Sequence, residues 1–281
     1  MPETLARTHL YHAEAAVLEG HLTLPLVQEI KTQAYAKLSE KGGYLAQHES
    51  NYRLESVISF RKAYTQVAGN RGDKPGHGWS TLASSVVEGL NVLDVVTADR
   101  VVAQISVEHP LVGYVPSITF LGTRFENLRI AGHPVKLDLD LNLFGTKPDN
   151  DAPYTKSSAF ADRVAAQHSQ VQSHPNLIQE LVQRYTGFAR DAENPEAVEC
   201  SLVNQADGAF PGSSHGHLIH VPDFGTVCLA NVRLEQSDWI PNLGTPRKTT
   251  VLLTMIEMKM GCVASGSSNV AALKTNGATM P

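Results

Sequence analysis

Hydrophobic and polar residues alternate with a period of two along most of the chain. The alternation is clearest over residues 135–143, where five apolar positions are separated by polar ones: Val135, Leu137, Leu139, Leu141 and Leu143. Only a β-strand places every second side chain on one face. A longer alternating segment covers residues 95–107 and ends at His109 and Pro110. The chain is therefore predicted to be mainly β, as a sandwich or a closed antiparallel sheet.

Glycine and proline residues divide the alternating segments into strands. Residues 8–38 predict a long hairpin with a bulge or break at Gly20. Residues 44–52 and 54–68 predict a second pair of strands, closed by a turn-rich loop at 69–78 that serves as a mobile tip or a binding element. Further strands are expected at residues 118–121, 125–130, 198–203, 217–221, 227–234 and 249–260.

The hydrophobic period changes once. Phe160, Val164 and Val171 recur at helical spacing, Pro175 suits the first position of a second helix, and Gly187 suits the end of that helix. We expect one αα-hairpin at about residues 156–189, inserted into a single β-rich domain that covers residues 1–281.

Composition narrows the classes of partner. The chain has 281 residues, of which 42% are hydrophobic, and this content is ordinary for a soluble globular protein. Its net charge of −5 comes from scattered residues and leaves no basic stripe, which argues against a nucleic-acid partner. No run of about 18 apolar residues predicts a membrane span. The N-terminus shows no signal peptide, so a cytoplasmic location is the default expectation.

The three cysteines, Cys200, Cys228 and Cys262, do not describe a disulfide framework. We expect free thiols packed as small hydrophobic side chains. The alternative is one disulfide between two strands of the C-terminal third.

Three histidines within six residues form the strongest chemical candidate. His215, His217 and His220 would supply most of the first shell of a transition metal such as zinc. His215 and His217 would share one face of a strand, whereas His220 has the opposite parity. The alternative is a polar strand whose histidines meet solvent or backbone carbonyls. A third ligand from elsewhere, such as His109, Asp99 or Glu235, cannot be ranked from the sequence.

Three other motifs favour structural roles. The segment at residues 212–216 matches G-x-S-x-G, but a turn precedes it and a strand follows, which argues against a nucleophile elbow. Asp138, Asp140 and Asn142 resemble the start of a calcium loop, yet Leu143 occupies the position that requires glycine, so a solvated sheet face is expected. Asp99 lies in mid-strand and should have a structural hydrogen bond or ion pair.

Three segments carry a resemblance to a known group. They read SVVEGLNVLDVVTAD at 85–99, GTRFENLRIAGHPV at 122–135 and FGTVCLANVRL at 224–234. Together they resemble the choice-of-anchor P group of bacterial proteins. The resemblance implies a bacterial β-rich protein of unassigned activity, often exported, and offers no catalytic residues to carry over. This chain departs from the group in its helical insertion and in showing no signal peptide or terminal anchor.

No acid, base or nucleophile constellation stands out. The leading hypothesis is therefore a non-catalytic protein that acts by binding another protein or by self-association at exposed strand edges. The first alternative is a metal-dependent hydrolase or oxidase that uses His215 and His217. The second is a carrier that holds a small-molecule ligand inside the β framework.

Overall fold

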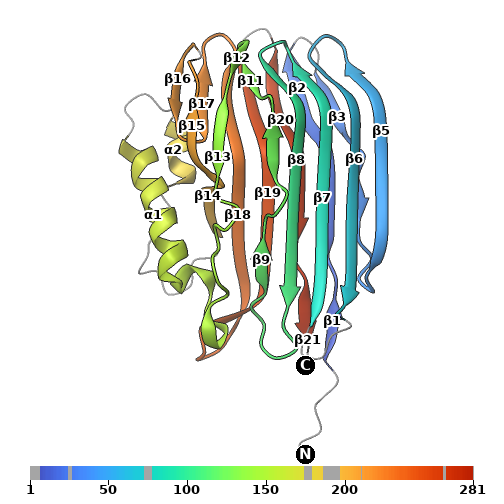
Figure 1. Cartoon of the computed structure of the whole chain (residues 1–281), viewed down its shortest axis with the longest axis vertical. Helices are drawn as coiled ribbons and strands as arrows, with labels where there is room; N and C mark the ends of the chain where they lie inside the picture. The colour runs from blue at the N-terminus through green and yellow to red at the C-terminus, as the bar shows by residue number, and fades with distance from the viewer. Residues whose placement is uncertain are drawn as a thin grey trace, which may run out of the picture.

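The computed structural model describes residues 7–24, 27–72, 78–173, 179–185, 197–209, 211–261 and 264–280. It is 63% strand and 11% helix. All strand pairs among these residues are antiparallel, and the strand content confirms the predicted mainly β class (Figure 1).

The larger sheet has 11 strands. In spatial order its main path is β16 (Ser213–His215), β17 (Leu218–Val221), β18 (Gly225–Ile240), β19 (Thr245–Gly261), β20 (Ser265–Thr275), β2 (Ala13–Leu24) and β3 (Gln28–Gln33). Beside this path, β14 (Ala197–Ser201) pairs with β18, β4 (Ala36–Lys37) pairs with β2, and β1 (Thr8–Leu10) pairs with β21 (Ala278–Met280).

The second sheet has eight strands. Its main path is β12 (His133–Pro134), β11 (Arg129–Ile130), β8 (Val96–His109), β7 (Trp79–Val92), β6 (Ile58–Arg71) and β5 (Gly43–Leu54), and β9 (Ser117–Thr119) and β10 (Arg124–Glu126) also pair with β8. A small separate sheet contains β13 (Lys136–Leu139) and β15 (Val203–Asp207).

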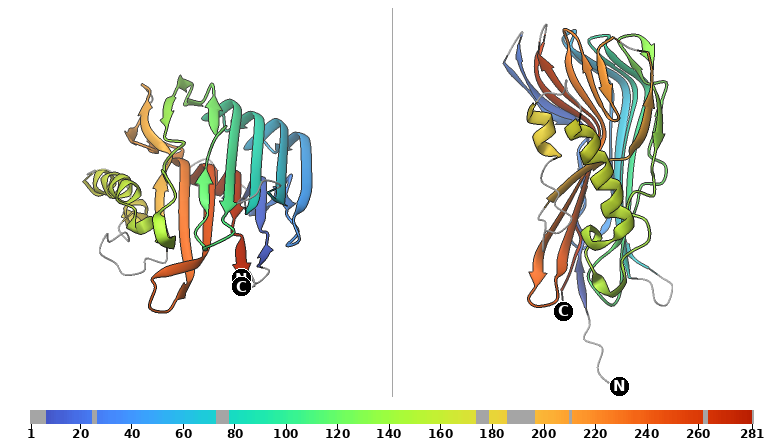
Figure 2. Two further views of the ribbon diagram at one scale, coloured as in Figure 1. Left: turned by 60° about the horizontal axis from the view of Figure 1, so that its bottom comes forward. Right: turned by 90° about the vertical axis from the view of Figure 1, so that its left-hand side faces the viewer.

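The two large sheets contact each other through β2 and β20 of one and β7 of the other (Figure 2). One hydrophobic cluster contains side chains of both, including Val17 and Val87. The Ser85 hydroxyl crosses between the sheets and donates to the carbonyl of Ala16 at 2.9 Å. Neither strand path closes on itself over the part of the chain that the structure describes.

The N-terminal hairpin is partly as predicted. The pairing of β2 with β3 shifts register between Leu18 and Gly20, which confirms the bulge. Gly20 has a φ of +152°, and a Cβ there would lie 2.2 Å from the carbonyl oxygen of Ser267 in β20, so close strand approach requires glycine. The hairpin does not extend over residues 8–38, however, because β1 pairs with the C-terminal β21 instead.

The second predicted strand pair is confirmed as β5 and β6. Of the loop at 69–78, residues 73–77 lie outside the described residues. Gly72 and Gly78 close the two ends of this loop with a backbone hydrogen bond of 2.8 Å.

The strand expected at residues 135–143 is shorter than predicted, and the prediction was wrong beyond Leu139. The Asp140 carboxylate accepts a hydrogen bond from the backbone N–H of Asn142 at 3.0 Å, and the chain turns there. Leu143 and Phe144 are nevertheless buried, and Phe144 stacks on Phe160 of the following helix. The apolar positions therefore continue past the end of the strand because these residues pack beneath a helix, not because the strand goes on.

Two helices occur in the region predicted to be helical, α1 (Ser158–Ser173) and α2 (Gln179–Arg184), after 3₁₀ turns η1 (Asp149–Asp151) and η2 (Tyr154–Lys156). Helix α1 buries Phe160, Val164 and Val171, as their spacing predicted. It lies beside the end of the larger sheet that contains β14, β16, β17 and β18 (Figures 1 and 2). Pro175 and Gly187 lie outside the described residues.

Cys200 and Cys228 are buried free thiols, as predicted, and Cys262 lies outside the described residues. Among the described helices, none is both long enough and apolar enough to cross a membrane.

Candidate functional site

A tight hairpin between β16 and β17 positions two of the three predicted histidines. His215 pairs with Leu218, so Gly216 and His217 form a two-residue turn. Gly216 has a φ of +54°, which glycine adopts without strain. The expected strand over 217–221 therefore starts at Leu218. The prediction that His215 and His217 share one face of a single strand was wrong.

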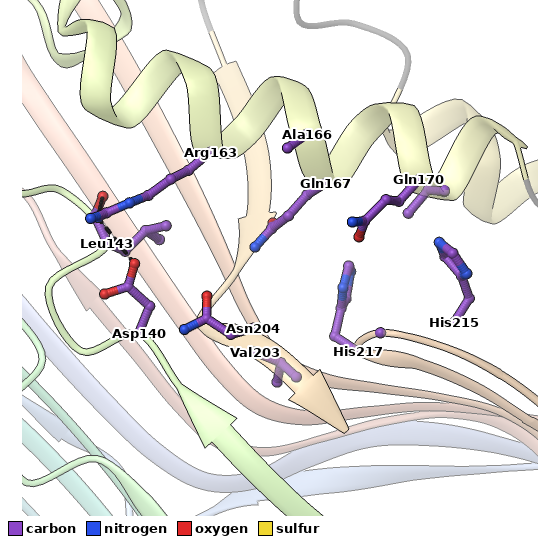
Figure 3. Close-up of a pocket in the computed structure, with 12 residues that line it drawn as sticks. Asp140, Leu143, Arg163, Ala166, Gln167, Gln170, Val203, Asn204, His215 and His217 are labelled. Atoms are coloured by element: carbon purple, nitrogen blue, oxygen red, sulfur yellow. Dashed lines mark hydrogen bonds and ion pairs between the residues drawn. The ribbon is translucent and has the colours of Figure 1, made fainter. Parts of the chain in front are cut away.

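The turn nevertheless brings His215 and His217 into one cleft beneath α1 (Figure 3). The cleft has a volume of about 170 Å³. His220 faces Ser213 across the hairpin and lines a different hollow, beside Phe224 and Met260.

One face of α1 forms the upper wall of the cleft. Arg163, Ala166, Gln167 and Gln170 have the i, i+3, i+4, i+7 spacing that places side chains on one helical face. The opposite wall and the ends contain Asp140, Leu143, Val203, Asn204, His215 and His217. In Figure 3 the side chain of Gln170 lies close to both imidazoles.

Two side chains attach α1 to β14. The side-chain amide of Gln167 donates to the backbone carbonyl of Ser201 and accepts from the backbone N–H of Ser201, each at 2.9 Å. His168 Nε2 lies 2.6 Å from the Glu199 carbonyl oxygen. These contacts fix the helical wall relative to the larger sheet.

A buried polar cluster supports His217 from below. The Tyr185 hydroxyl lies 2.7 Å from His217 Nε2 and 3.8 Å from Cys228 Sγ. Next to Tyr185, Arg184 makes two hydrogen bonds to the Glu257 carboxylate, at 2.7 and 2.9 Å, and one to Glu199 at 2.8 Å. Tyr185 thus binds the hairpin turn and β18, and Arg184, the last residue of α2, binds β14 and β19.

Asn231 completes this cluster. With its amide oriented so that the oxygen accepts from Arg184 Nη2 at 2.9 Å, its nitrogen donates to the Cys200 carbonyl at 3.0 Å. The planar guanidinium is therefore bound to groups on β14, β18 and β19, a geometry that arginine satisfies and lysine does not.

Burial favours the uncharged forms of His217, Cys228 and Tyr185 around the turn. It lowers the pKa of His217 to about 3, with a further contribution from Arg184. It also raises the pKa of the Cys228 thiol to about 12 and that of Tyr185 well above its usual value. For Arg184, burial alone would lower the pKa, but the hydrogen bonds and charge of Glu257 outweigh it and raise the pKa. At neutral pH the cluster therefore has no thiolate, phenolate or imidazolium.

Metal binding at the histidines stays a prediction. No three His, Cys, Asp or Glu side chains are grouped to hold a metal ion in the described part of the chain. Of the candidate third ligands, Asp99 binds Asn127, Glu235 binds Arg233, and His109 is buried at the far end of β8. A zinc site would therefore require rearrangement around His215 and His217.

The other predicted motifs have structural partners. Asp99 accepts a hydrogen bond from Asn127 at 2.6 Å, which confirms the expected structural contact. Asp140 forms an ion pair with Arg163 at 3.0 Å, and Asp138 accepts from Asn204 at 3.3 Å. Residues 213–215 form β16 and lead into a hairpin turn, so this G-x-S-x-G segment is not a strand-to-helix elbow.

Sequence reasoning missed the supporting cluster. Arg184, Tyr185, Glu199 and Glu257 come from separate segments with no shared motif. A single signal was available: an Arg-Tyr pair at the end of the predicted second helix, where two large polar side chains follow an apolar face.

A second candidate surface is the free edge formed by β5. It is the last strand of its sheet, and it pairs only with β6 among the described strands. None of its 12 residues is buried, and Tyr44 is 67% exposed. Asn51 has a φ of +55° and interrupts the pairing with β6, which leaves residues 43–50 as a regular edge.

Comparisons with curated proteins and with solved structures found no match. They do not link the chain to the choice-of-anchor P group, so the bacterial setting implied by that resemblance stays a prediction. Residues 9–235 match the family described as Domain of unknown function (DUF8256). This match includes the second sheet, α1, α2 and the histidine hairpin, and it extends over well more than half of the chain. Of the larger sheet it leaves out the end of β18 and all of β19, β20 and β21. The chain therefore belongs to the DUF8256 family.

Proposed function

We propose that this is a non-catalytic protein that acts by binding or self-association, with the edge strand β5 as the interaction surface. The observation that carries the proposal is the exposure of β5 along its whole length. An edge strand offers a row of backbone N–H and C=O groups to which another strand can pair.

The other ends of the two sheet paths are protected in ways that β5 is not. β12 has two residues and contains Pro134, β16 has three residues, and β3 has six residues that include Lys31. Short length, proline, charged side chains and bulges are the usual means of blocking edge-to-edge pairing. β5 has 12 residues, and its charged side chains, Glu49 and Arg53, flank the interruption at Asn51, so residues 43–48 carry none of these features.

A matched pair of substitutions tests this role. Tyr44→Lys puts a charge on the regular part of β5, whereas Tyr35→Lys changes another exposed tyrosine that lies outside that strand. We expect the wild-type chain to associate with rising concentration in sedimentation velocity, Tyr44→Lys to weaken that association, and Tyr35→Lys to leave it unchanged. A chain that stays monomeric at every concentration and binds no extended peptide would count against the proposal.

The metal-dependent enzyme is a second candidate, favoured by the convergence of His215 and His217 in one cleft. Elemental analysis of untagged protein beside a His215→Ala, His217→Ala double variant tests it. Near-stoichiometric metal that the variant loses would support this candidate, and absence of metal after reconstitution would remove it. The carrier alternative predicts a ligand that co-purifies and is visible by native mass spectrometry.

For the fold, we propose a single-domain sandwich of the two large sheets, with α1 and α2 as an inserted helical hairpin. Contacts of β2 and β20 with β7 support the first part. The hydrogen bond from Gln172 in α1 to the carbonyl of Tyr185, which follows α2, supports the second.

A further inference from the structure

We infer that His9 and His109 form an acid-sensitive switch, through which mild acid separates β1 from the fold before the two large sheets unfold. β1 and its partner β21 lie side by side, close to both ends of the chain (Figure 1). Neither strand belongs to the edge β5, so the inference does not depend on the proposed function.

The two imidazole rings are packed against each other away from solvent. His9 is 6% exposed and His109 is 1% exposed, and their ring centroids lie 4.6 Å apart. A Cβ at Gly277 would lie 2.8 Å from His9 Nε2 and 2.6 Å from His109 Nε2. The connection between β20 and β21 therefore closes over both rings, and only glycine leaves room for them there.

The rings have few hydrogen bonds. His9 Nδ1 lies 3.1 Å from the Thr279 hydroxyl on β21. The other three ring nitrogens, His9 Nε2 and both nitrogens of His109, have no hydrogen-bond partner among the described residues. A protonated imidazole carries two N–H donors, and a buried charge without acceptors costs far more than a buried neutral ring.

The surrounding charges also oppose protonation. Burial lowers the pKa of His9 to about 4. Burial lowers the pKa of His109 to about 3, with smaller effects of His9 and Lys147. Of the other charged groups nearby, Arg7 is bound to the Gly113 carbonyl, and Glu108 is exposed on the opposite face of β8 from its neighbour His109.

Arg71 is the remaining charged group near this cluster, and it adds positive charge. It lies opposite Trp79 in the pairing of β6 with β7, and its charge acts on Tyr11, whose ring meets the edge of His9. No carboxylate is therefore placed to balance a charge on either imidazole in the described part of the chain.

Trp79 makes the two rings unequal. Its indole stacks on His9 with a centroid distance of 5.1 Å, so a cation–π contact would offset part of the cost of charging His9. Among the ring contacts of the described residues, His109 meets only His9. His109 should therefore respond to acid more strongly than His9.

The opening is expected to be local because few contacts attach β1. It has three residues and pairs only with β21 among the described strands, and β21 pairs with β19 at the single position of Ala278 and Lys248. By contrast, β19 pairs along most of its length with β18 and β20. Separation of β1 exposes the His9 ring and uncovers His109 while these long pairings stay intact.

Hydrogen exchange at pH 7.5 and pH 5, corrected for the intrinsic effect of pH on amide exchange, tests the switch. Solvated histidine titrates near 6.5, so protonation of one ring should lower the protection of the β1 amides by about 30-fold, and protonation of both by up to about 1000-fold. Low urea concentrations should leave the exchange of β1 unaltered and accelerate that of β19, as local opening requires.

Histidine variants separate this mechanism from other effects of acid. His9→Gln and His109→Gln should each keep the response of the remaining ring, and the double variant should lose most of the pH dependence. His133→Gln is the matched control, since His133 is exposed on β12, and it should respond like the wild-type chain.

Three results would overturn the inference. The first is protection of the β1 amides that does not change with pH. The second is a pH dependence that the double variant retains. The third is exchange of β1 only together with β19, which would mean that acid unfolds the whole chain at once.

Discussion

At the scale of single residues, the orientation of His217 depends on one hydroxyl group. Tyr185 is the partner of its Nε2 atom, and both side chains are buried. Sequence reasoning identified His217 from its neighbours His215 and His220 but assigned it to a strand. The glycine before it, with its positive φ, is what turns the chain there.

Tyr185→Phe should destabilise the fold by about 1–2 kcal/mol, because a buried imidazole loses its partner. It should also change the ring resonances of His217. The control is Tyr154→Phe, since Tyr154 is equally buried but its hydroxyl donates to the Pro116 carbonyl at 2.9 Å and not to His217. The control should cost similar stability in urea unfolding and leave His217 unchanged. Unaltered His217 signals in Tyr185→Phe would contradict this account.

A second residue-scale prediction concerns acid. The buried rings of His9 and His109 lie 4.6 Å apart where the two terminal strands meet. Burial lowers the pKa of His9 to about 4, and burial, with smaller effects of His9 and Lys147, lowers that of His109 to about 3. Unfolded histidine titrates near 6.5, so the unfolded chain binds more protons below that pH. The stability that the two neutral rings contribute to the free energy of unfolding should be fully present above pH 6.5 and fall steadily towards pH 4.

Urea unfolding between pH 7.5 and 4.5 measures this dependence. His9→Gln should make the dependence shallower, because one of the imidazoles whose pKa burial lowers is removed. Equal stability of the wild-type chain at pH 7 and pH 5 would be the contrary result.

At the scale of elements, long alternating strands were predictable and short or small-residue strands were not. β6 and β8 alternate over many residues and were found within a few positions. β20 was missed because its sequence, SGSSNVAALKT, is rich in small residues and gives little contrast between its two faces. Its place between β19 and β2 depends on close backbone approach, which glycine and serine allow.

Gly20→Ala tests that close approach. The new Cβ would lie 2.2 Å from the Ser267 carbonyl oxygen, so β2 and β20 would have to separate. We expect thermal unfolding to report a loss of about 2–4 kcal/mol. Gly132→Ala is the control, because Gly132 also has a positive φ but no atom within 4 Å of its Cβ position. Equal losses of stability in the two variants would contradict this prediction, because the cost would then come from backbone conformation alone and not from close strand approach.

At the scale of the whole molecule, the cleft and its support are assembled from segments that sequence patterns cannot join. Arg184 is the last residue of α2, yet it binds Glu257, which lies 73 residues later in β19. Periodicity predicts which face of an element is buried, but not which buried polar groups meet across elements.

Arg184→Met should therefore destabilise the chain by about 2–4 kcal/mol, because Glu257 and Glu199 lose a partly buried partner. Arg124→Met is the control. Its ion pair with Glu126 on β10 is more exposed and lies in the other sheet, so the expected loss in urea unfolding is below about 1 kcal/mol. A loss for Arg184→Met no larger than for the control would show that the cluster does not hold the helical region to the sheet.

The central claim, that β5 is an interaction edge, is tested most directly by residue-resolved hydrogen exchange at increasing protein concentration. Alternate backbone amides of an edge strand point away from the sheet and exchange unless another strand covers them. We predict that alternate amides of residues 43–50 become protected as concentration rises, while those of β3 and β16 do not change. Exchange in β5 that is independent of concentration, with no added partner able to slow it, would contradict the claim.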